Sequence, residues 1–187
     1  MNKIAIFASG SGSNAENIIK YFGTKKTAIV TKVYCNKKGA GIFDRCKRLQ
    51  KECVLFTKNE LFSSDELLNQ LKNEADYIIL AGFLLKIPLR LINAFPNKII
   101  NIHPALLPKY GGKGMYGMHV HNAVKENMET ETGITIHFVN ENYDEGAIIF
   151  QAKTQLESTD SADDIAQKIH QLEYENFPKV IESVIVK

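Results

Sequence analysis

The chain has 187 residues, of which 44% are hydrophobic and 24% are charged, and its formal net charge is +2 at pH 7. This balance is typical of an ordinary globular protein, and the length suits one core, so we expect a single domain over residues 1–187. The sequence has no basic stripe interleaved with aromatic residues, and we therefore expect no nucleic-acid partner.

The cysteines Cys35, Cys46 and Cys53 indicate a reducing compartment. They are odd in number and form no Cys-x-x-Cys pair, which argues against a disulfide framework or a zinc knuckle. We interpret them as small, partly buried hydrophobic residues. The apolar start is too short for a secretory signal, and no apolar run approaches the length that spans a bilayer. We expect a cytoplasmic protein without a membrane partner.

The first predicted strand, 4–8, is continuously apolar, as is typical of a strand buried on both faces of a parallel sheet. It leads into the glycine-rich turn Ser9–Asn14, after which apolar residues recur at helical spacing. The N–H groups of such a turn and the positive end of the following helix bind anions, and Ser13 and Asn14 add side-chain donors suited to phosphate. A tight turn with a good helix cap explains the pattern equally well.

A dinucleotide site is the main functional alternative for this turn, because Gly10-x-Gly12-x-x-Ala15 fits the glycine-tolerant form of that motif. The motif also requires an acidic residue at the end of the second strand, where it holds the ribose hydroxyls. The second predicted strand, 28–35, is followed by Asn36 and two lysines instead. The sequence therefore predicts a phosphate loop for a mononucleotide or similar monoester, and not a nicotinamide site.

The middle of the chain alternates between predicted helices and strands. A helix over about 39–51 precedes a strand over 53–56, a capping box at 63–66 opens another helix, and a fourth strand covers 77–81. This alternation predicts an α/β fold with three layers: a Rossmann-like, mostly parallel, twisted sheet with helices on both faces. The segment after the fourth strand, 82–88, carries large apolar side chains. Those side chains suit one wall of an apolar slot for a flat ligand, or simply a cover for the core.

Asn101 and His103 follow a short apolar run at the fifth predicted strand. Being two residues apart, they point the same way on an extended backbone, and Pro104 prevents the strand from continuing as a regular ladder. Ligands of open α/β sheets bind at such carboxyl ends. A strand-end pair that merely satisfies backbone groups at a proline turn is equally compatible with the pattern.

The glycine-rich loop over 108–118 is long for a compact domain, which favours a functional role. The following His119-Val120-His121 resembles a metal pair, but no third ligand has convincing spacing and the two rings diverge by roughly 200° at a helix start, so we expect no metal.

The C-terminal third predicts an antiparallel hairpin and a final helix. A strand over 133–139 with period-two alternation and a return strand over 147–151 predict the hairpin, whose loop contains Asp144. The final helix begins at a cap at Ser161, is kinked or restarted by Pro178, and carries His170 and Glu173 beside its apolar stripe.

Together and in this order, these segments resemble the glycinamide ribonucleotide formyltransferases, a family of folate-dependent enzymes of purine biosynthesis. The resemblance covers nearly the whole chain. It rests on Gly10-x-Gly12-Ser13-Asn14, Ala81-Gly82-Phe83, Asn101-Ile102-His103-Pro104 with Leu106-Leu107-Pro108, and Asp144-x-Gly146.

The resemblance implies formyl transfer from 10-formyltetrahydrofolate to the amine of glycinamide ribonucleotide, two small-molecule substrates, with Asn101, His103 and Asp144 as catalytic residues. Asn101 would donate to the tetrahedral oxyanion, His103 would donate to it or shuttle a proton, and Asp144 would favour the imidazolium. The nucleotide phosphate and ribose are assigned to Gly12, Ser13, Asn14, His170 and Glu173. The folate is assigned to Phe83, Leu84, Leu85, Ile87, Asn140 and Asp144.

Two features depart from the family's pattern. Leu85 stands where better-known members carry an arginine, with Lys86 following, and the loop Gly111–Gly117 is longer than in the shortest relatives. Within the same chemistry, a formyltetrahydrofolate hydrolase and a methionyl-tRNA formyltransferase are alternatives, but each is expected to need a further domain. A non-catalytic nucleotide-binding module is the alternative from another class. The sequence is compatible with a monomer or a homodimer.

Overall fold

The computed structural model, which describes residues 1–186, contains a seven-stranded sheet with the order β3-β2-β1-β4-β5-β6-β7. The strands are β1 (Asn2–Ala8), β2 (Ala28–Cys35), β3 (Cys53–Leu55), β4 (Tyr77–Leu80), β5 (Ile99–His103), β6 (Glu131–Phe138) and β7 (Ile148–Gln155). The helices are α1 (Ser13–Lys25), α2 (Ile42–Arg48), α3 (Lys58–Ser63), α4 (Asp65–Glu74), α5 (Leu89–Ala94), α6 (Met118–Glu126) and α7 (Ala162–Ile185).

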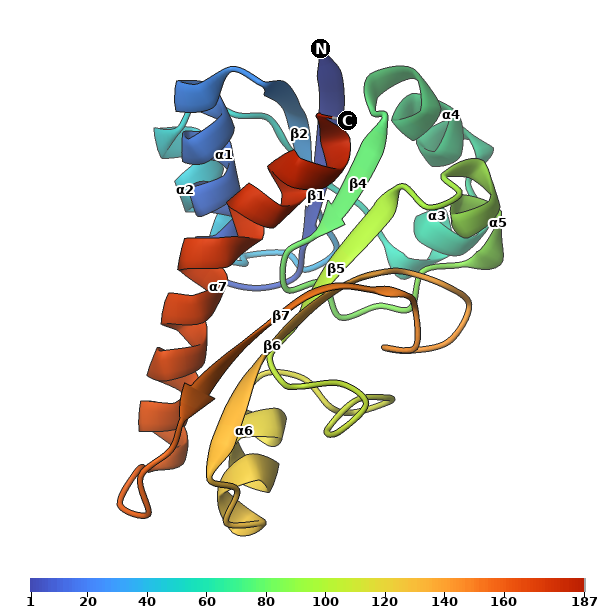
Figure 1. The fold of residues 1–187 in the computed structure, drawn as a ribbon. Coiled ribbons are helices and arrows are strands. Elements are labelled where there is room, and N and C mark those ends of the chain that lie inside the picture. Colours follow the sequence, from blue (N-terminus) through green and yellow to red (C-terminus); the bar gives the residue numbers. More distant parts are fainter. Residues whose placement is uncertain (187) are drawn as a thin grey trace.

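The first five strands pair in parallel, and β6 and β7 extend the sheet in antiparallel pairing. Figure 1 shows helices on both faces, with α1, α2 and α7 on one side and α3, α4 and α5 on the other. The predicted fold class is therefore confirmed, including its three layers and its C-terminal antiparallel hairpin.

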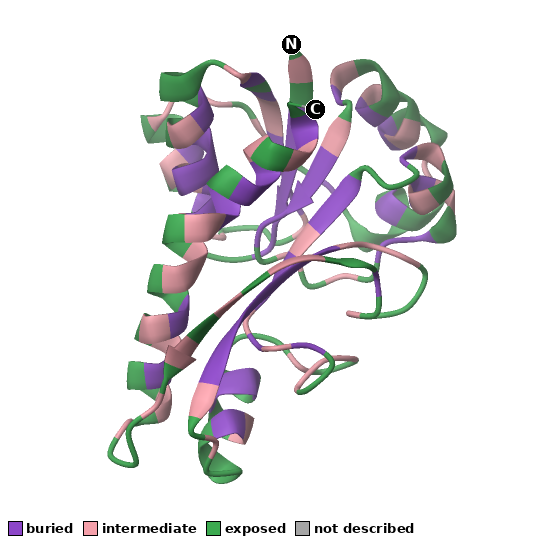
Figure 2. Cartoon of the chain, viewed as in Figure 1, coloured by how far each residue is buried: buried purple, intermediate pink, exposed green. Residues whose placement is uncertain are grey.

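Burial along β1 explains why this strand lies in the middle of the sheet. Ile4 and Ile6 pack into the core under α1 and α7, whereas Ala5 and Phe7 pack into the core under α4 and α5. All four are fully buried, and the central strands are accordingly coloured as buried in Figure 2. An uninterrupted apolar run is what a strand covered on both faces requires.

The strand order reverses at β1: β2 and β3 lie on one side of it, and β4 follows on the other. Ligands of doubly wound sheets bind in the crevice that this reversal opens at the carboxyl ends of the strands. The loops after β1 and β4 meet there, since the Ser9 N–H donates to the Gly82 carbonyl over 3.0 Å.

Some helix boundaries differ from those that the sequence predicts. The helix near 39–51 is limited to Ile42–Arg48, and the short α3 is an addition. Ser64 does cap α4 by accepting from the Leu67 N–H, but the reciprocal capping box belongs to α3, between Thr57 and Glu60. That box carries the Thr-x-x-Glu signature, in front of a helix of only six residues.

Helix α7 is continuous through Pro178, so the predicted restart is wrong, although its axis bends toward the C-terminus in Figure 1. Proline removes the N–H that would bond the carbonyl four residues earlier. That carbonyl, on Tyr174, instead accepts a 2.8 Å hydrogen bond from the Asn17 side chain of α1. Within residues 1–186, no helix, α7 included, is long and apolar enough to cross a membrane.

Candidate active site

A cavity of about 1290 Å³ opens at the carboxyl ends of β1, β4 and β5. Its walls come from four regions that are far apart in the sequence: the turn 10–14, the segment 81–84, the segment 101–104 with the loop 112–117, and helix α7. The hairpin loop adds Tyr143 and Asp144. The sheet topology therefore brings most of the predicted functional segments together around one space.

The glycine turn at the start of α1 has a geometry that only glycine permits at position 12. Gly12 has φ +77°, and a Cβ there would overlap the Ile42 side chain of α2. The turn is held from outside by Arg45, whose Nε donates to the Ser11 carbonyl over 2.8 Å and whose guanidinium pairs with Glu16. The unpaired first N–H groups of α1 are thereby fixed at the cavity wall, as an anion site requires.

Asn14 and Glu173 form a polar pair across the cavity wall. The Asn14 side-chain nitrogen donates to Glu173 Oε2 over 2.9 Å, and His170 Nδ1 lies 3.3 Å from the same oxygen. This contact raises the pKa of His170, although burial opposes it. One of the two N–H groups of the Asn14 amide is thus engaged by Glu173, and the other can serve a ligand beside the backbone N–H groups of the turn and Ser13.

β5 presents Asn101 and His103 on one face at its carboxyl end, as the spacing predicts. His103 is only 3% exposed, and its Nε2 donates to the Tyr110 carbonyl over 2.7 Å. In a neutral ring this bond leaves the lone pair on Nδ1, which lies 3.6 Å from Asp144 Oδ2. Asp144 therefore reaches His103 from the hairpin, about forty residues further along the chain.

The pKa values of this pair are set by burial and by their mutual charge. Burial lowers the pKa of His103, and the Asp144 charge only partly offsets this effect. Burial alone would raise the pKa of Asp144, but His137, the His103 charge and the Gly112 N–H together hold it below its ordinary value. At neutral pH the free protein accordingly pairs a neutral imidazole with a carboxylate. The expected preference for imidazolium is outweighed by burial.

His137 is a fourth member of this group that the sequence analysis did not identify. It lies opposite Asn101 in the β5–β6 register, 2% exposed, with Nε2 at 3.7 Å from Asp144 Oδ1. Its Nδ1 bonds the Phe138 carbonyl over 2.8 Å, so in a neutral ring Nε2 accepts from the Asn101 side-chain nitrogen over 3.0 Å. This chain of bonds orients the Asn101 amide and leaves its second N–H for a ligand.

The hairpin loop is shaped to carry Asp144 inward. Asp144 has φ 56°, a left-handed conformation that aspartate tolerates better than most residues, and its Oδ2 accepts from the Gly112 N–H over 2.9 Å. Gly146 lies so close to the backbone of Phe138 that a Cβ there would overlap the Phe138 carbonyl. The Asp144-x-Gly146 sequence therefore reflects a close backbone approach that positions the carboxylate.

The predicted folate residues divide into two groups. Phe83 and Leu84 line the cavity, and the Phe83 ring packs edge-on against Phe7 of β1 at a centroid distance of 5.2 Å. Leu85 packs against the core under α4 and α5, and Ile87 belongs to that core. Asn140 is half-buried, and its side chain accepts from the Asn142 N–H in the hairpin loop. Leu85, Ile87 and Asn140 do not line the cavity.

The two histidines weighed as a metal pair diverge. His119 is exposed and packs against the Tyr116 ring, whereas His121 is buried on the cavity side with an unpaired Nδ1. Over residues 1–186, no three histidine, cysteine, aspartate or glutamate side chains are grouped so that they could hold a metal ion.

Comparison with known proteins gives consistent matches. The family model described as formyl transferase matches residues 2–181. The phosphoribosylglycinamide formyltransferase of Bacillus subtilis is 34% identical and aligns over 99% of this chain and 95% of its own. The chloroplastic enzyme of Arabidopsis thaliana is 37% identical over 97% of this chain, which spans only 65% of that protein. A solved glycinamide ribonucleotide transformylase from Geobacillus kaustophilus is 31% identical and covers 99% of each chain with a TM-score of 0.87.

Proposed function

We propose, since this chain belongs to the formyl transferase family, that it moves the formyl group of 10-formyltetrahydrofolate to the amine of glycinamide ribonucleotide. The products are N-formylglycinamide ribonucleotide and tetrahydrofolate, and the reaction belongs to purine biosynthesis. The names of the similar bacterial and plant proteins support this assignment. The three free thiols suit a reducing compartment, and we therefore propose that the enzyme is cytoplasmic. We further propose that its substrates are small molecules and that it acts as a monomer or a homodimer.

The observation that carries the proposal is the convergence of Asn101, His103 and Asp144 on the cavity that the glycine turn and Phe83 also line. His137 lies behind them, in contact with Asn101 and Asp144. A formyl transferase needs an amide donor, a proton carrier and a carboxylate at the junction of two ligands. A module that only binds nucleotides has no use for this group.

The two substrates would approach this group from opposite sides. The nucleotide phosphate suits the N–H groups at Gly12 and Ser13, because a helix N-terminus favours negative charge. The ribose hydroxyls suit the Glu173 carboxylate, which is already bonded to Asn14 and is 12% exposed. The folate ring suits the apolar wall at Phe83 and Leu84, under the hairpin loop.

The proposed reaction begins with attack of the nucleotide amine on the formyl carbon, which forms a C–N bond and places the carbonyl electrons on oxygen. The free N–H of Asn101 donates to this oxyanion, a contact worth about 3 kcal/mol. Neutral His103 accepts the proton that the amine loses, and the Asp144 carboxylate stabilises the imidazolium. The proton then passes to N10 of the folate as its bond to the formyl carbon breaks.

One assay tests the assignment. The purified protein is mixed with glycinamide ribonucleotide and a 10-formyl folate, and the absorbance of the deformylated folate is followed. We expect deformylation that requires both substrates and yields a formylated nucleotide by mass spectrometry. Deformylation without the nucleotide would identify a hydrolase, and no turnover under any condition would contradict the proposal.

A further inference from the structure

His121 is a buried histidine on the cavity wall that has no part in the site described above. It lies in the first turn of α6 and is 6% exposed, and neither of its ring nitrogens makes a hydrogen bond within residues 1–186. Nδ1 is enclosed by the protein, which leaves Nε2 as the nitrogen that a ligand in the cavity can reach. Buried polar side chains normally have a partner, so this unpaired ring requires an explanation.

Buried polar atoms without a partner occur on only two side chains in the described part of the chain, and both residues line this cavity. They are His121 Nδ1 and Asn14 Oδ1. Glu173 acts on both residues: its Oε2 accepts from the Asn14 amide over 2.9 Å, and its charge partly offsets the burial that lowers the pKa of His121. Since burial prevails, the His121 ring is neutral at pH 7. The polar group around Glu173 is therefore incomplete without a ligand.

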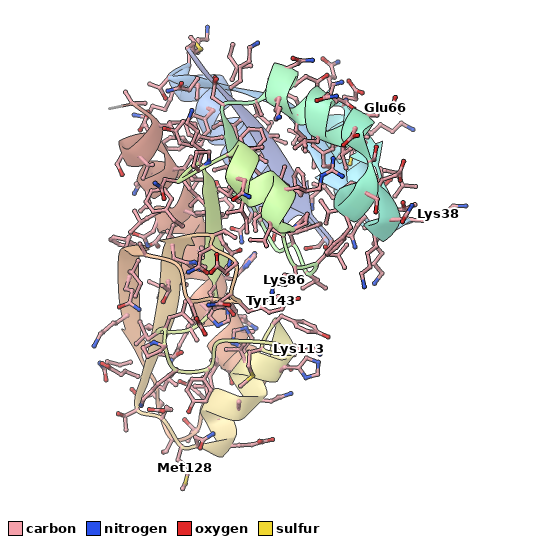
Figure 3. The ribbon with its side chains drawn as sticks, turned by 90° about the vertical axis from the view of Figure 1, so that its right-hand side faces the viewer. Lys38, Glu66, Lys86, Lys113, Met128 and Tyr143 are labelled. Atoms are coloured by element: carbon pink, nitrogen blue, oxygen red, sulfur yellow. The ribbon has the colours of Figure 1, made fainter. Side chains whose placement is uncertain are left out.

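Three helices bring these side chains to the cavity. Helices α1 and α6, which carry Asn14 and His121, both pack against α7, which carries Glu173. Figure 3 shows Lys113, a residue of the cavity wall, beside the upper end of α6, and Met128 beyond its lower end. The first turn of α6 is thus the end that faces the cavity, and it brings His121 to the side where the nucleotide is proposed to bind.

The hydrogen-bonding groups of His121 and Glu173 define the ligand that would satisfy them. Proteins tolerate a buried unpaired acceptor better than a buried unpaired N–H, so the enclosed Nδ1 carries the lone pair and Nε2 carries the proton. Within residues 1–186, no group bonds Oε1 of Glu173, which can only accept. A hydroxyl can donate to this carboxylate and accept from the imidazole at once, whereas a phosphate oxygen only accepts and an ammonium only donates.

We infer that His121 donates from Nε2 to a ribose hydroxyl whose own proton Glu173 accepts, and that it makes the protein discriminate against nucleotides that lack this hydroxyl. This inference rests on the proposed function, in which Glu173 binds the ribose. With the hydroxyl in place, both protein groups are paired. With a deoxyribose, the N–H and the carboxylate both lose their partner in a largely buried position, which costs more than the absence of one bond.

The chain offers a matched control for this residue. His119 lies in the same turn of α6, but it is exposed, packs against the Tyr116 ring and does not line the cavity. His119→Phe therefore makes the same replacement on the same helix without touching the ligand. At position 121, His121→Phe keeps an aromatic ring without a donor, and His121→Gln restores a side-chain N–H at a reach similar to that of Nε2.

The experiment measures kcat and KM of the full chain for glycinamide ribonucleotide and for its 2′-deoxy and 3′-deoxy analogues, at saturating 10-formyl folate. His121→Phe should lower kcat/KM for the ribonucleotide about tenfold, mainly through KM, and should have little effect on the analogue that lacks the bound hydroxyl. His121→Gln should recover part of the loss, and His119→Phe should behave as the wild type. Without ligand, His121→Phe should melt at or above the wild-type temperature, since it removes a buried polar atom that has no partner.

Other outcomes would overturn the inference without touching the proposed function. Equal losses with all three nucleotides would show that His121 does not bind a ribose hydroxyl, and a lower melting temperature beside them would make its role structural. Wild-type kinetics in His121→Phe would show that the imidazole has no role in binding. Absence of formyl transfer by the wild type would contradict the proposed function itself, and the inference with it.

Discussion

The parallel strands β1 to β5 and the antiparallel pair β6 and β7 contribute different kinds of group to the cavity. The parallel part supplies the backbone N–H groups of the glycine turn, the apolar wall at Phe83, and the pair Asn101 and His103. The antiparallel pair and its loop supply His137 and Asp144, both ionisable and both next to that pair.

The two parts are also covered differently. β1 and β4 are buried on both faces, whereas β7 alternates between exposed and half-buried positions. His137 and Asp144 are nevertheless buried, since His137 lies on the covered strand β6 and is 2% exposed, and the Asp144 side chain is 12% exposed. We expect ligand binding to depend mainly on the parallel part, and proton transfer on His103 of β5 together with Asp144 of the hairpin.

The largest effect is expected for Asn101→Ala, at the junction of the two parts. Loss of one preorganised oxyanion donor should lower kcat about 100- to 1000-fold, with little change in either KM. Steady-state kinetics with both substrates measure this, and thermal melting controls for folding. Near-normal turnover with an unchanged melting temperature would remove Asn101 from the mechanism.

Asp144→Asn should lower kcat about 100-fold and change its pH dependence. The Asp144 charge raises the pKa of His103 against the effect of burial, so its removal lowers that pKa further. If neutral His103 accepts the amine proton, activity falls as the pH drops through this pKa, and the acid limb of the variant lies at lower pH than that of the wild type. An acid limb at the same pH in both proteins would show that His103 does not carry this proton.

Much of the parallel part could be predicted from the sequence because its signals are local. The apolar run before Gly10 and Gly12 specifies a buried strand and a turn, and the two-residue spacing of Asn101 and His103 specifies their common face. These features depend on neighbours along the chain. The convergence of Asp144 on His103 was expected from the family resemblance, and the spacing between them gave no physical reason for it.

The remaining features of the fold and the site depend on contacts between segments that are far apart in the sequence. His137 takes its place from the register that sets it opposite Asn101, and a period-two pattern does not reveal which residue lies across the strand. Leu85 and Ile87 look like Leu84 in sequence, but only the packing of helices on that face decides which side chains join the core. Helix α3 is an exception, because the capping box between Thr57 and Glu60 is a local signal that predicts its start.

His137→Phe tests whether the hairpin orients a residue of the parallel part. Phenylalanine cannot accept the Asn101 N–H, so the amide would rotate, and kcat should fall roughly tenfold, the loss of about one hydrogen bond. His137→Gln offers a side-chain oxygen as acceptor and should recover part of the loss, with KM values near those of the wild type. Equal losses in the two variants would indicate that His137 acts by bulk rather than by orienting Asn101.

The smallest effect concerns the stability of the layer that supports the glycine turn. Asn17→Ala removes the side-chain donor to the Tyr174 carbonyl, which lacks its helical partner because Pro178 has no N–H. We expect the free energy of unfolding to fall by about 1 kcal/mol and kcat to stay unchanged. Chemical denaturation measures this loss. Asn127→Ala removes a solvent-exposed bond of the same length, to the Ala123 carbonyl at the C-terminal end of α6, and is the matched control that should cost less.

Pro178→Ala tests this compensation directly, because alanine restores an N–H that can bond the Tyr174 carbonyl within α7. In that background Asn17→Ala should cost less than in the wild type, with a coupling of at least about 0.5 kcal/mol in a double-mutant cycle. Purely additive losses would mean that Asn17 does not compensate for the proline. The continuity of α7, which carries Glu173 to the cavity five residues before Pro178, would then need another explanation.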